Sequence, residues 1–468
     1  MLTSREAIAA LKERRLNIDC VRMELVQETR DNPHRYVGSG CICQDKEGVI
    51  TFKMYANEVT NTSMIGHIQS VSVNRAGTLY GGSDFFTLTG IDYSGLAWGA
   101  RNVLPEVEWS QPIPATSARF PCISGKIYVL LRSPLAYPSQ SGHSLTMRFF
   151  NEIDIPTTHM SRTETTSGSR EMSEMAQDYT EFFAANCHFY VRHLDGGIEL
   201  EASSDTPFSP TFELRVEEAL RFVLAYPVTW RVIINRGDGR EQCRLSSERK
   251  ASPNVALQRP LRCDRFEDIP SFWKLFGKYL EYVLENSDGS DWSKCSLHLN
   301  HALQASANSI DAWAIALCIS IEGISSLVDW VEDPDSKARR VTVCRHVREW
   351  LGSTGWQDQA LAMRVNGLLS MLGSPRVIDR LAHLVIQGKV SADHLRRWKA
   401  LRNPGAHGSG PTFDGSDAKA AQALLDDIRK VSSLMYHLCF HLIGYEGPFT
   451  NYAITGWPTG TYPLLPPE

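Results

Sequence analysis

Two patterns of hydrophobic residues divide this chain. Between about residues 20 and 250, apolar and polar residues alternate over short stretches that are separated by turn residues. This is the pattern of β-strands with one buried face. From about residue 261 onward, apolar residues recur every three or four positions, which is typical of amphipathic helices. We therefore predict an α+β protein in which an N-terminal β-rich module is followed by a C-terminal all-α helical bundle.

The clearest strand signal is a hairpin over residues 38–55. Its turn is Asp45-Lys-Glu-Gly48, and its flanks alternate or are β-branched. One helix, Thr211 to Tyr226, is expected among the strands, and the Ser- and Thr-rich stretch from Thr157 to Ser173 is expected to be an exposed loop. Further strands are predicted at 85–90, 125–131, 144–150, 189–193 and 229–235. Together they favour a sandwich or a curved sheet.

The helical half follows a polar stretch, Ser246 to Pro260, which we interpret as a linker. Helices are predicted at 268–286, 293–306, 310–331, 337–352, 357–372, 375–387, 391–402 and 416–443. After Gly447 the chain is rich in proline, glycine and aromatic residues, and we expect an irregular tail. The predicted parts are therefore a β-rich domain over 1–250, a helical domain over 261–446 and a tail over 447–468.

Composition narrows the class of protein. The chain has 468 residues, which is too long for one ordinary core, and its net charge of −5 argues against a protein that coats nucleic acid non-specifically. Eleven cysteines without C-x-x-C pairs fit a reducing compartment. The N-terminus lacks the apolar stretch of a signal peptide, and the longest apolar run, Ala312 to Ile321, is shorter than the roughly 20 residues that a membrane span needs. We expect a cytoplasmic protein with no membrane segment.

The candidate chemistry lies in Lys399-Ala-Leu-Arg-Asn-Pro-Gly-Ala-His-Gly408. Pro404 disfavours helical geometry at the residue before it, so the helix should end at about Arg402. The chain should then turn through Gly405 and place His407 beside Arg402. Phosphodiester cleavage needs a fixed cation for charge and an imidazole for proton transfer, and this segment offers both.

The segment resembles the R-x4–6-H motif of HEPN domains, small helical bundles that include many metal-independent ribonucleases. Arg402, the polar Asn403 and His407 match that pattern. Two further segments are similar to ApeA-like HEPN proteins of bacterial anti-phage defence: Ile319-Ser-Ile-Glu-Gly-Ile-Ser-Ser-Leu327, and the closing Gly444-Tyr-Glu-Gly followed by Asn451-Tyr. The resemblance covers roughly the last two hundred residues, whereas the N-terminal half matches only in being β-rich.

The resemblance implies RNA cleavage without a metal or other cofactor. His407 would move the proton of the 2′-hydroxyl or of the leaving oxygen, Arg402 would stabilise the charged transition state, and Asn403 would hold the histidine or the phosphate. The products would be a 2′,3′-cyclic phosphate and a 5′-hydroxyl end. It also implies a homodimer or higher homo-oligomer formed through the helical domain, with RNA (tRNA or another host RNA) as substrate. The β-rich domain would then recognise an unknown phage trigger, and cleavage would cause abortive infection.

Each of these candidate residues also has a non-catalytic interpretation. Arg402 can be an ordinary cation at a helix end, and His407 a loop histidine. Glu322 lies in an apolar stretch: it either pairs with Arg402 and orients the guanidinium, or lies on a wetter stripe with Ser325, Ser326 and Asp329. Spacing alone does not choose between the two. The alternative class of function is a non-catalytic HEPN-type module that binds RNA, a nucleotide or a protein.

Other charged and metal-ligating residues carry weaker hypotheses. Lys399 lies one turn before Arg402, so it can meet RNA phosphate. The basic stretch 337–348 is interpreted as solvent-facing. His437 and His441 have the spacing of a metal pair without the glutamate of H-E-x-x-H, and Cys41 and Cys43 have no partner pair, so we predict no metal site.

Overall fold

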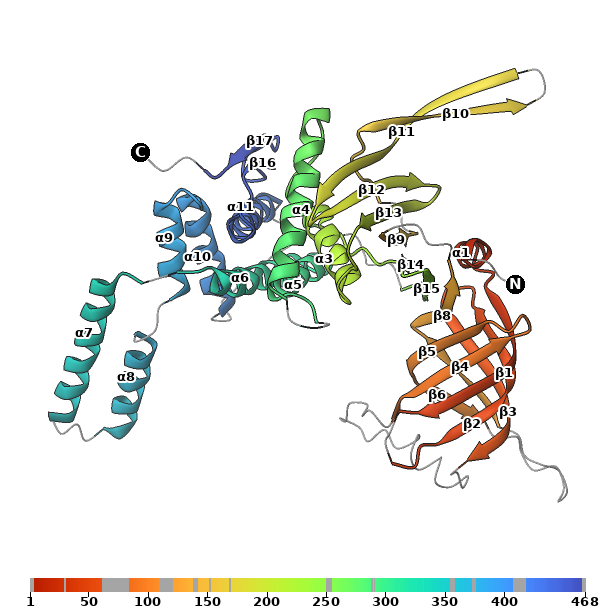
Figure 1. The fold of residues 1–468 in the computed structure, drawn as a ribbon. Coiled ribbons are helices and arrows are strands. Elements are labelled where there is room, and N and C mark those ends of the chain that lie inside the picture. Colours follow the sequence, from red (N-terminus) through yellow and green to blue (C-terminus); the bar gives the residue numbers. More distant parts are fainter. Residues whose placement is uncertain are drawn as a thin grey trace. The chain divides into compact units, whose positions relative to one another are not determined.

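The computed structural model describes residues 4–28, 31–60, 84–108, 121–137, 142–150, 153–167, 170–249, 255–287, 289, 291–330, 332–353, 358–372, 376–406 and 418–464. The protein is α+β, as predicted: a large antiparallel sheet occupies the N-terminal half, and helices occupy the C-terminal half (Figure 1). Contacts divide it into two compact units. The sheet unit comprises Met1–Glu213 and Val228–Ala251, and the helical unit comprises Leu214–Pro227 and Ser252–Glu468.

The sheet unit is built from one helix and a sheet in which every pairing is antiparallel. The helix is α1 (Ser4–Lys12). The strands are β1 (Asn17–Gln27), β2 (Arg35–Gln44), β3 (Ile50–Thr60), β4 (Phe86–Asp92), β5 (Ala97–Val103), β6 (Pro105–Glu108), β7 (Cys122–Ile127), β8 (Val129–Ala136), β9 (His143–Phe149), β10 (His159–Ser167), β11 (Arg170–Ala184), β12 (Cys187–Leu194), β13 (Gly197–Ser204), β14 (Val232–Gly237) and β15 (Arg240–Ser246). Their order across the sheet is β10-β11-β12-β13-β9-β14-β15-β8-β5-β4-β1-β2-β3-β7-β6.

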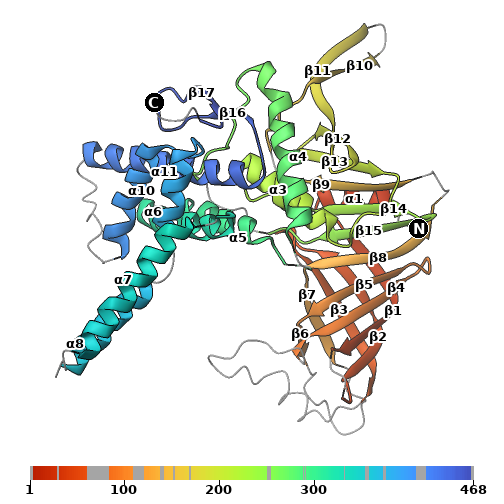
Figure 2. The same cartoon turned by 60° about the vertical axis from the view of Figure 1, so that its left-hand side comes forward.

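Alternation places the core of this unit on one side of each strand. On β3, Ile50, Phe52, Met54 and Ala56 are all buried, whereas the residues between them are less buried or exposed. These side chains join a cluster with buried residues of β1, β2, β4, β5, β8 and β15 and with the apolar face of α1. The strands β1–β8 curve around this cluster (Figure 2). The sheet is therefore a curved one, which is one of the two predicted arrangements.

Two predictions for this unit differ from the structure. The stretch from Thr157 to Ser173 is not a loop, because β10 and the start of β11 form a hairpin there. Threonine is β-branched and suits strands, so a polar composition indicated exposure without excluding pairing. The strand predicted over 125–131 is two strands, β7 and β8, separated at Tyr128. Strands β1, β5, β6, β13 and β15 were not predicted.

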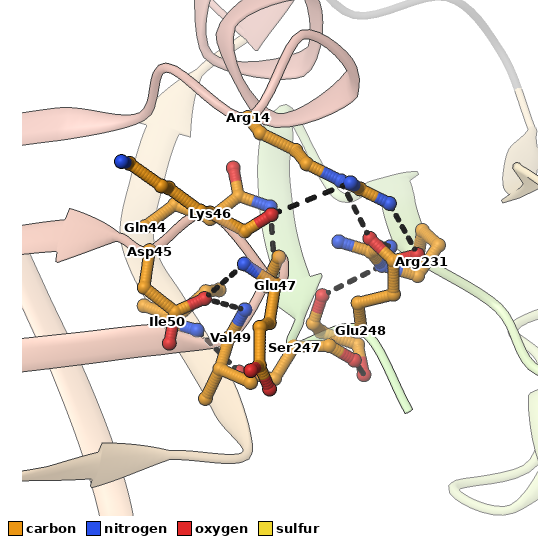
Figure 3. A network of polar contacts seen from close by, with 12 residues as sticks. Arg14, Gln44, Asp45, Lys46, Glu47, Val49, Ile50, Arg231, Ser247 and Glu248 are labelled. Carbon is orange, nitrogen blue, oxygen red and sulfur yellow. Dashed lines mark hydrogen bonds and ion pairs between the residues drawn. The ribbon is translucent and has the colours of Figure 1, made fainter. Parts of the chain in front are cut away.

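A network of polar contacts fixes the place where the chain leaves the sheet (Figure 3). Glu248, just after β15, accepts hydrogen bonds from Arg14 at 2.9 and 3.2 Å and lies 3.2 Å from the Arg231 guanidinium. The Arg231 side chain is 6% exposed, and its Nε donates to the Ser246 carbonyl at 2.9 Å. Burial lowers the pKa of Arg231, and Glu248 opposes that shift. Glu248 therefore compensates a charge that the fold has removed from water.

Replacing Glu248 with Ala should lower the free energy of unfolding by about 2 kcal/mol, because Arg231 would stay buried without its carboxylate. The measurement is urea unfolding of the full chain followed by circular dichroism. Glu47→Ala is the matched control, since that exposed carboxylate lies in the same turn region (Figure 3). Equal stability of the two variants would contradict this role for Glu248.

The helical unit contains most of α3 (Phe212–Leu224), the one helix predicted among the strands. The other helices are α4 (Ile269–Glu285), α5 (Lys294–Ala305), α6 (Ile310–Leu327), α7 (Pro334–Ser353), α8 (Gln359–Leu372), α9 (Val377–Ile386), α10 (Ala392–Ala406) and α11 (Ala418–Leu442). Each lies where a helix was predicted. The largest differences are at α6, which ends four residues early because Val328 is extended, and at α10, which continues four residues further.

Buried contacts of α3 explain why it belongs to the helical unit. Arg215 is fully buried, pairs with Glu218 one turn later, and donates at 2.9 Å to the carbonyls of Gly289 and Asp291. The ring of Phe222 stacks on Tyr279 of α4 at 4.2 Å. Sequence periodicity indicated the helix but not the surface that it covers.

The segment after α11 is more ordered than the irregular tail that was predicted. It forms a two-stranded ribbon of β16 (Gly447–Thr450) and β17 (Thr459–Tyr462). Thr450 accepts a hydrogen bond from the Arg262 amide at 2.7 Å, and the Tyr452 hydroxyl donates to the Arg259 carbonyl at 2.6 Å. These contacts hold the ribbon against the chain that precedes α4.

Among the described helices, α6 alone has the length and apolar composition of a membrane span, and 39% of it is buried inside the protein. Apolar core helices of soluble proteins have the same composition, so this finding is compatible with a soluble protein.

Candidate active site at the end of helix α10

Helix α10 carries the first member of the candidate site. The prediction that it ends at about Arg402 was wrong, because it continues through Pro404 to Ala406. Proline removes one hydrogen bond from a helix and crowds the preceding turn, and here this cost does not end the helix. His407 lies outside the described residues, as does the side chain of Asn403. The predicted turn that would bring His407 to Arg402 stays a prediction.

Arg402 contacts Glu322 of α6. Its Nε donates a hydrogen bond to Oε1 of Glu322, although the two residues are 80 positions apart in the sequence. The side chain of Arg402 is 46% exposed and that of Glu322 is 34% exposed. A guanidinium has five N–H groups, so donors remain for a second anion after this bond is made. Of the two readings of Glu322, the one that pairs it with Arg402 is the contact that the structure contains.

Trp398 also positions Arg402. It lies one turn earlier on α10, is buried, and has the Arg402 guanidinium over its ring at 5.8 Å from the centroid. A cation over an indole face is attracted by the ring quadrupole. Trp398 was not among the residues predicted for the site, although its i, i+4 spacing to Arg402 was a usable signal.

Helix α6 holds Glu322 by burying the residues beside it. Ile321 and Ile324 are fully buried, and Gly323 lies so close to α5 that a Cβ there would come within 2.2 Å of Nε2 of His298. One turn before Glu322, burial chiefly, together with the Glu322 charge, raises the pKa of Cys318 to about 12. Cys318 is therefore a neutral core thiol.

Other cations of α10 are exposed or engaged elsewhere. Lys399 is exposed on the same helix, one turn before Arg402. Arg396 pairs with Asp393 at 3.4 Å, and Arg397 pairs with Asp427 of α11 at 3.3 Å. The expectation that Lys399 can meet phosphate stays a prediction.

The histidine pair of α11 does not form a metal centre within the described part of the chain, where no three His, Cys, Asp or Glu residues cluster. His437 is buried, with its ring 5.6 Å from that of His394 of α10 and 4.8 Å from that of Phe449. Neither ring nitrogen of His437 has a hydrogen-bond partner among these residues. Burial lowers the pKa of His394 to about 4 and that of His437 to about 3.

Comparison with known proteins adds no family to this geometry: no family model, curated protein or solved structure matches the chain.

Proposed function

We propose that this protein is a metal-independent endoribonuclease of the HEPN type, which cuts tRNA or other host RNA in bacterial anti-phage defence. The observation that supports it most is the Arg402 guanidinium, which is half-exposed and is held by a carboxylate and an aromatic ring. An arginine with a purely structural role makes its hydrogen bonds to its partner within the protein. Arg402 keeps N–H donors that can bind a phosphate, and a histidine follows five residues later in the sequence.

The roles follow from the chemistry of RNA cleavage. His407 takes the proton of the 2′-hydroxyl or gives one to the leaving 5′-oxygen, because an imidazole exchanges protons near neutral pH. Arg402 binds the non-bridging phosphate oxygens and stabilises the added negative charge. Glu322 and Trp398 are positioning residues that restrict the guanidinium. DNA lacks the attacking 2′-hydroxyl and is not a substrate.

A second copy of the chain is part of this proposal. On α6, Ile315 and Ile319 are 48% and 58% exposed and lie on the same helix face as Glu322. Exposed apolar side chains beside a functional residue fit a surface that another chain covers. An isologous contact across this face would bring two Arg402–His407 segments near each other.

We predict that Ile319→Asp prevents self-association and lowers RNA cleavage at least tenfold, because a carboxylate would be buried in the contact. Sedimentation and a cleavage assay on the same sample measure the two effects. Ile386→Asp is the matched control, since Ile386 is 75% exposed on α9. A monomeric wild-type protein, or an active monomeric variant, would contradict the role of the second copy.

The proposed activity is tested by incubating the full-length protein with total RNA in the presence of a metal chelator. Cleavage of RNA, with single-stranded DNA of the same length left intact, is the expected result. RNA that stays intact while it comigrates with the protein would favour the non-catalytic binding module. Loss of cleavage on adding the chelator would exclude the metal-independent mechanism.

A further inference from the structure

Helices α7 and α8 lie side by side in the helical unit (Figure 1). They pack on each other through a small apolar cluster in which Cys344 and Leu351 of α7 and Leu369 of α8 are buried. The Cys344 thiol donates to the Leu369 carbonyl at 3.7 Å. Most other residues of the two helices are exposed, so the side chains outside this cluster can meet a ligand.

Positive charge is concentrated on these two helices. They carry two acidic residues, Asp335 and Glu349, and six basic ones: Lys337, Arg339, Arg340, Arg345, Arg348 and Arg364. The whole chain has a net charge of −5, so the remainder of the protein is acidic. A basic region on an acidic protein attracts an anionic ligand to one place and not to the whole surface.

Three of these cations form a row along one side of α7. An α-helix turns by about 100° per residue, so Lys337, Arg345 and Arg348 lie within about 80° of one another around the helix axis. They span about 16 Å along that axis, and Arg339 lies on the opposite side of the helix. Lys337, Arg345 and Arg348 are all exposed, and we refer to them as the cation row.

The cation row contributes little to the fold itself. Within the described part of the chain, its one ion pair joins Arg345 to Glu349 of the same helix at 3.9 Å, and these side chains are 64% and 65% exposed. Such surface pairs add little stability. Arg340 differs, because its side chain is 20% exposed and donates to Glu332 at 2.6 Å. The charges of the cation row therefore remain available to a ligand.

The contact between Arg340 and Glu332 also joins α7 to the segment that follows α6. Helix α6 carries Glu322, the partner of Arg402. A side-chain contact thus links α7 to the chain that leaves the helix of the candidate active site. An RNA strand has phosphates on both sides of the cleaved bond, and these can meet cations outside the active site.

We propose that the cation row binds the phosphate backbone of the RNA substrate, as a surface separate from the candidate active site. This inference rests on the proposed function. Phosphates recur at regular intervals along a strand, which suits cations that are spread along one side of a helix. Arginine can grip two oxygens of one phosphate. Phosphate contacts carry no base information, so the row positions the strand and does not select its sequence.

The salt dependence of RNA binding tests this proposal. Fluorescence anisotropy of a labelled 2′-O-methyl RNA, which has no free 2′-hydroxyl to attack the phosphate, measures binding by the full-length protein at several salt concentrations. The double variant Arg345→Gln and Arg348→Gln should bind about tenfold more weakly, and the slope of log K against log salt should become about 1.4 less steep, because two phosphate contacts are lost. Arg345→Lys with Arg348→Lys should keep the wild-type slope, because the charge is retained.

Arg339→Gln with Arg364→Gln is the matched control, since it removes two exposed cations of the same helices from outside the row and should change the slope little. Equal slopes of the row variant and the control, or displacement of the RNA by poly-glutamate of equal charge, would overturn the assignment; the second result would indicate an acidic polypeptide as ligand. RNA cleavage is measured separately. Cleavage by the wild type together with normal RNA binding by the row variant would overturn the row alone. Loss of binding in the row variant, with RNA that the wild type does not cleave, would overturn the nuclease and support the row.

Discussion

Replacing His407 with Ala should reduce RNA cleavage at least about 100-fold, because it removes the imidazole that is proposed to exchange the proton of the 2′-hydroxyl or the leaving oxygen. Arg402→Ala should cause a loss of similar size, since the charge on the phosphate oxygens would no longer be stabilised. The measurement is the single-turnover rate of cleavage of a labelled RNA at saturating protein. Arg402→Ala should leave the thermal stability of the helical unit nearly unchanged, because the Arg402 side chain is half-exposed.

Matched variants separate this effect from a general loss of positive charge. Arg396 lies on the same helix, is 73% exposed and pairs only at the surface with Asp393, so Arg396→Ala should keep the wild-type rate. Glu322→Gln should lower the maximal rate and leave RNA binding nearly unchanged, because it frees the guanidinium without removing it. An undiminished rate in His407→Ala would refute the assignment of the site.

The second large effect concerns acid stability. His394 and His437 are buried as neutral rings, and their pKa values are lowered to about 4 and about 3. In the unfolded chain both would titrate near 6.5. Their contribution to stability is thus fully present above that pH and is lost as the pH falls toward the folded values. At pH 5 the loss is about 2 kcal/mol for each histidine.

Hydrogen exchange of α10 and α11 amides at pH 7.5 and pH 5, corrected for the intrinsic exchange rate, measures this loss. The double variant His394→Leu and His437→Leu should show a much smaller change in protection between the two conditions, and His346→Leu, an exposed histidine of α7, should behave like wild type. Equal protection of wild-type α10 and α11 at both pH values would show that the buried rings do not govern acid stability.

Local patterns predicted the elements of this protein better than their contacts. The turn Asp45-Lys-Glu-Gly48 lies between β2 and β3, and α11 lies within the helix predicted over 416–443. Both signals are local, because each depends on residues that are near one another in the sequence. The hairpin of β10 and β11 was missed because its polar composition conceals the pairing of strands. Pro404 predicted a helix end that the surrounding helix overrides.

In the candidate site too, the local element was easier to predict from the sequence than the contact that its residues make. Arg402 was chosen from its neighbours in sequence, but its pairing with Glu322 joins residues 80 positions apart, and spacing left that contact undecided. The packing of α6 against α10 determines it. Which residues of neighbouring strands lie opposite each other in the sheet depends on strand register, which no local pattern specifies.

The chemical nature of the RNA ends tests the central claim most directly. After incubation of total RNA with the wild-type protein and a chelator, the new ends should be 2′,3′-cyclic phosphates and 5′-hydroxyls, and none should form with His407→Ala. New 3′-hydroxyl and 5′-phosphate ends, or RNA without new ends, would contradict cleavage by attack of the 2′-hydroxyl.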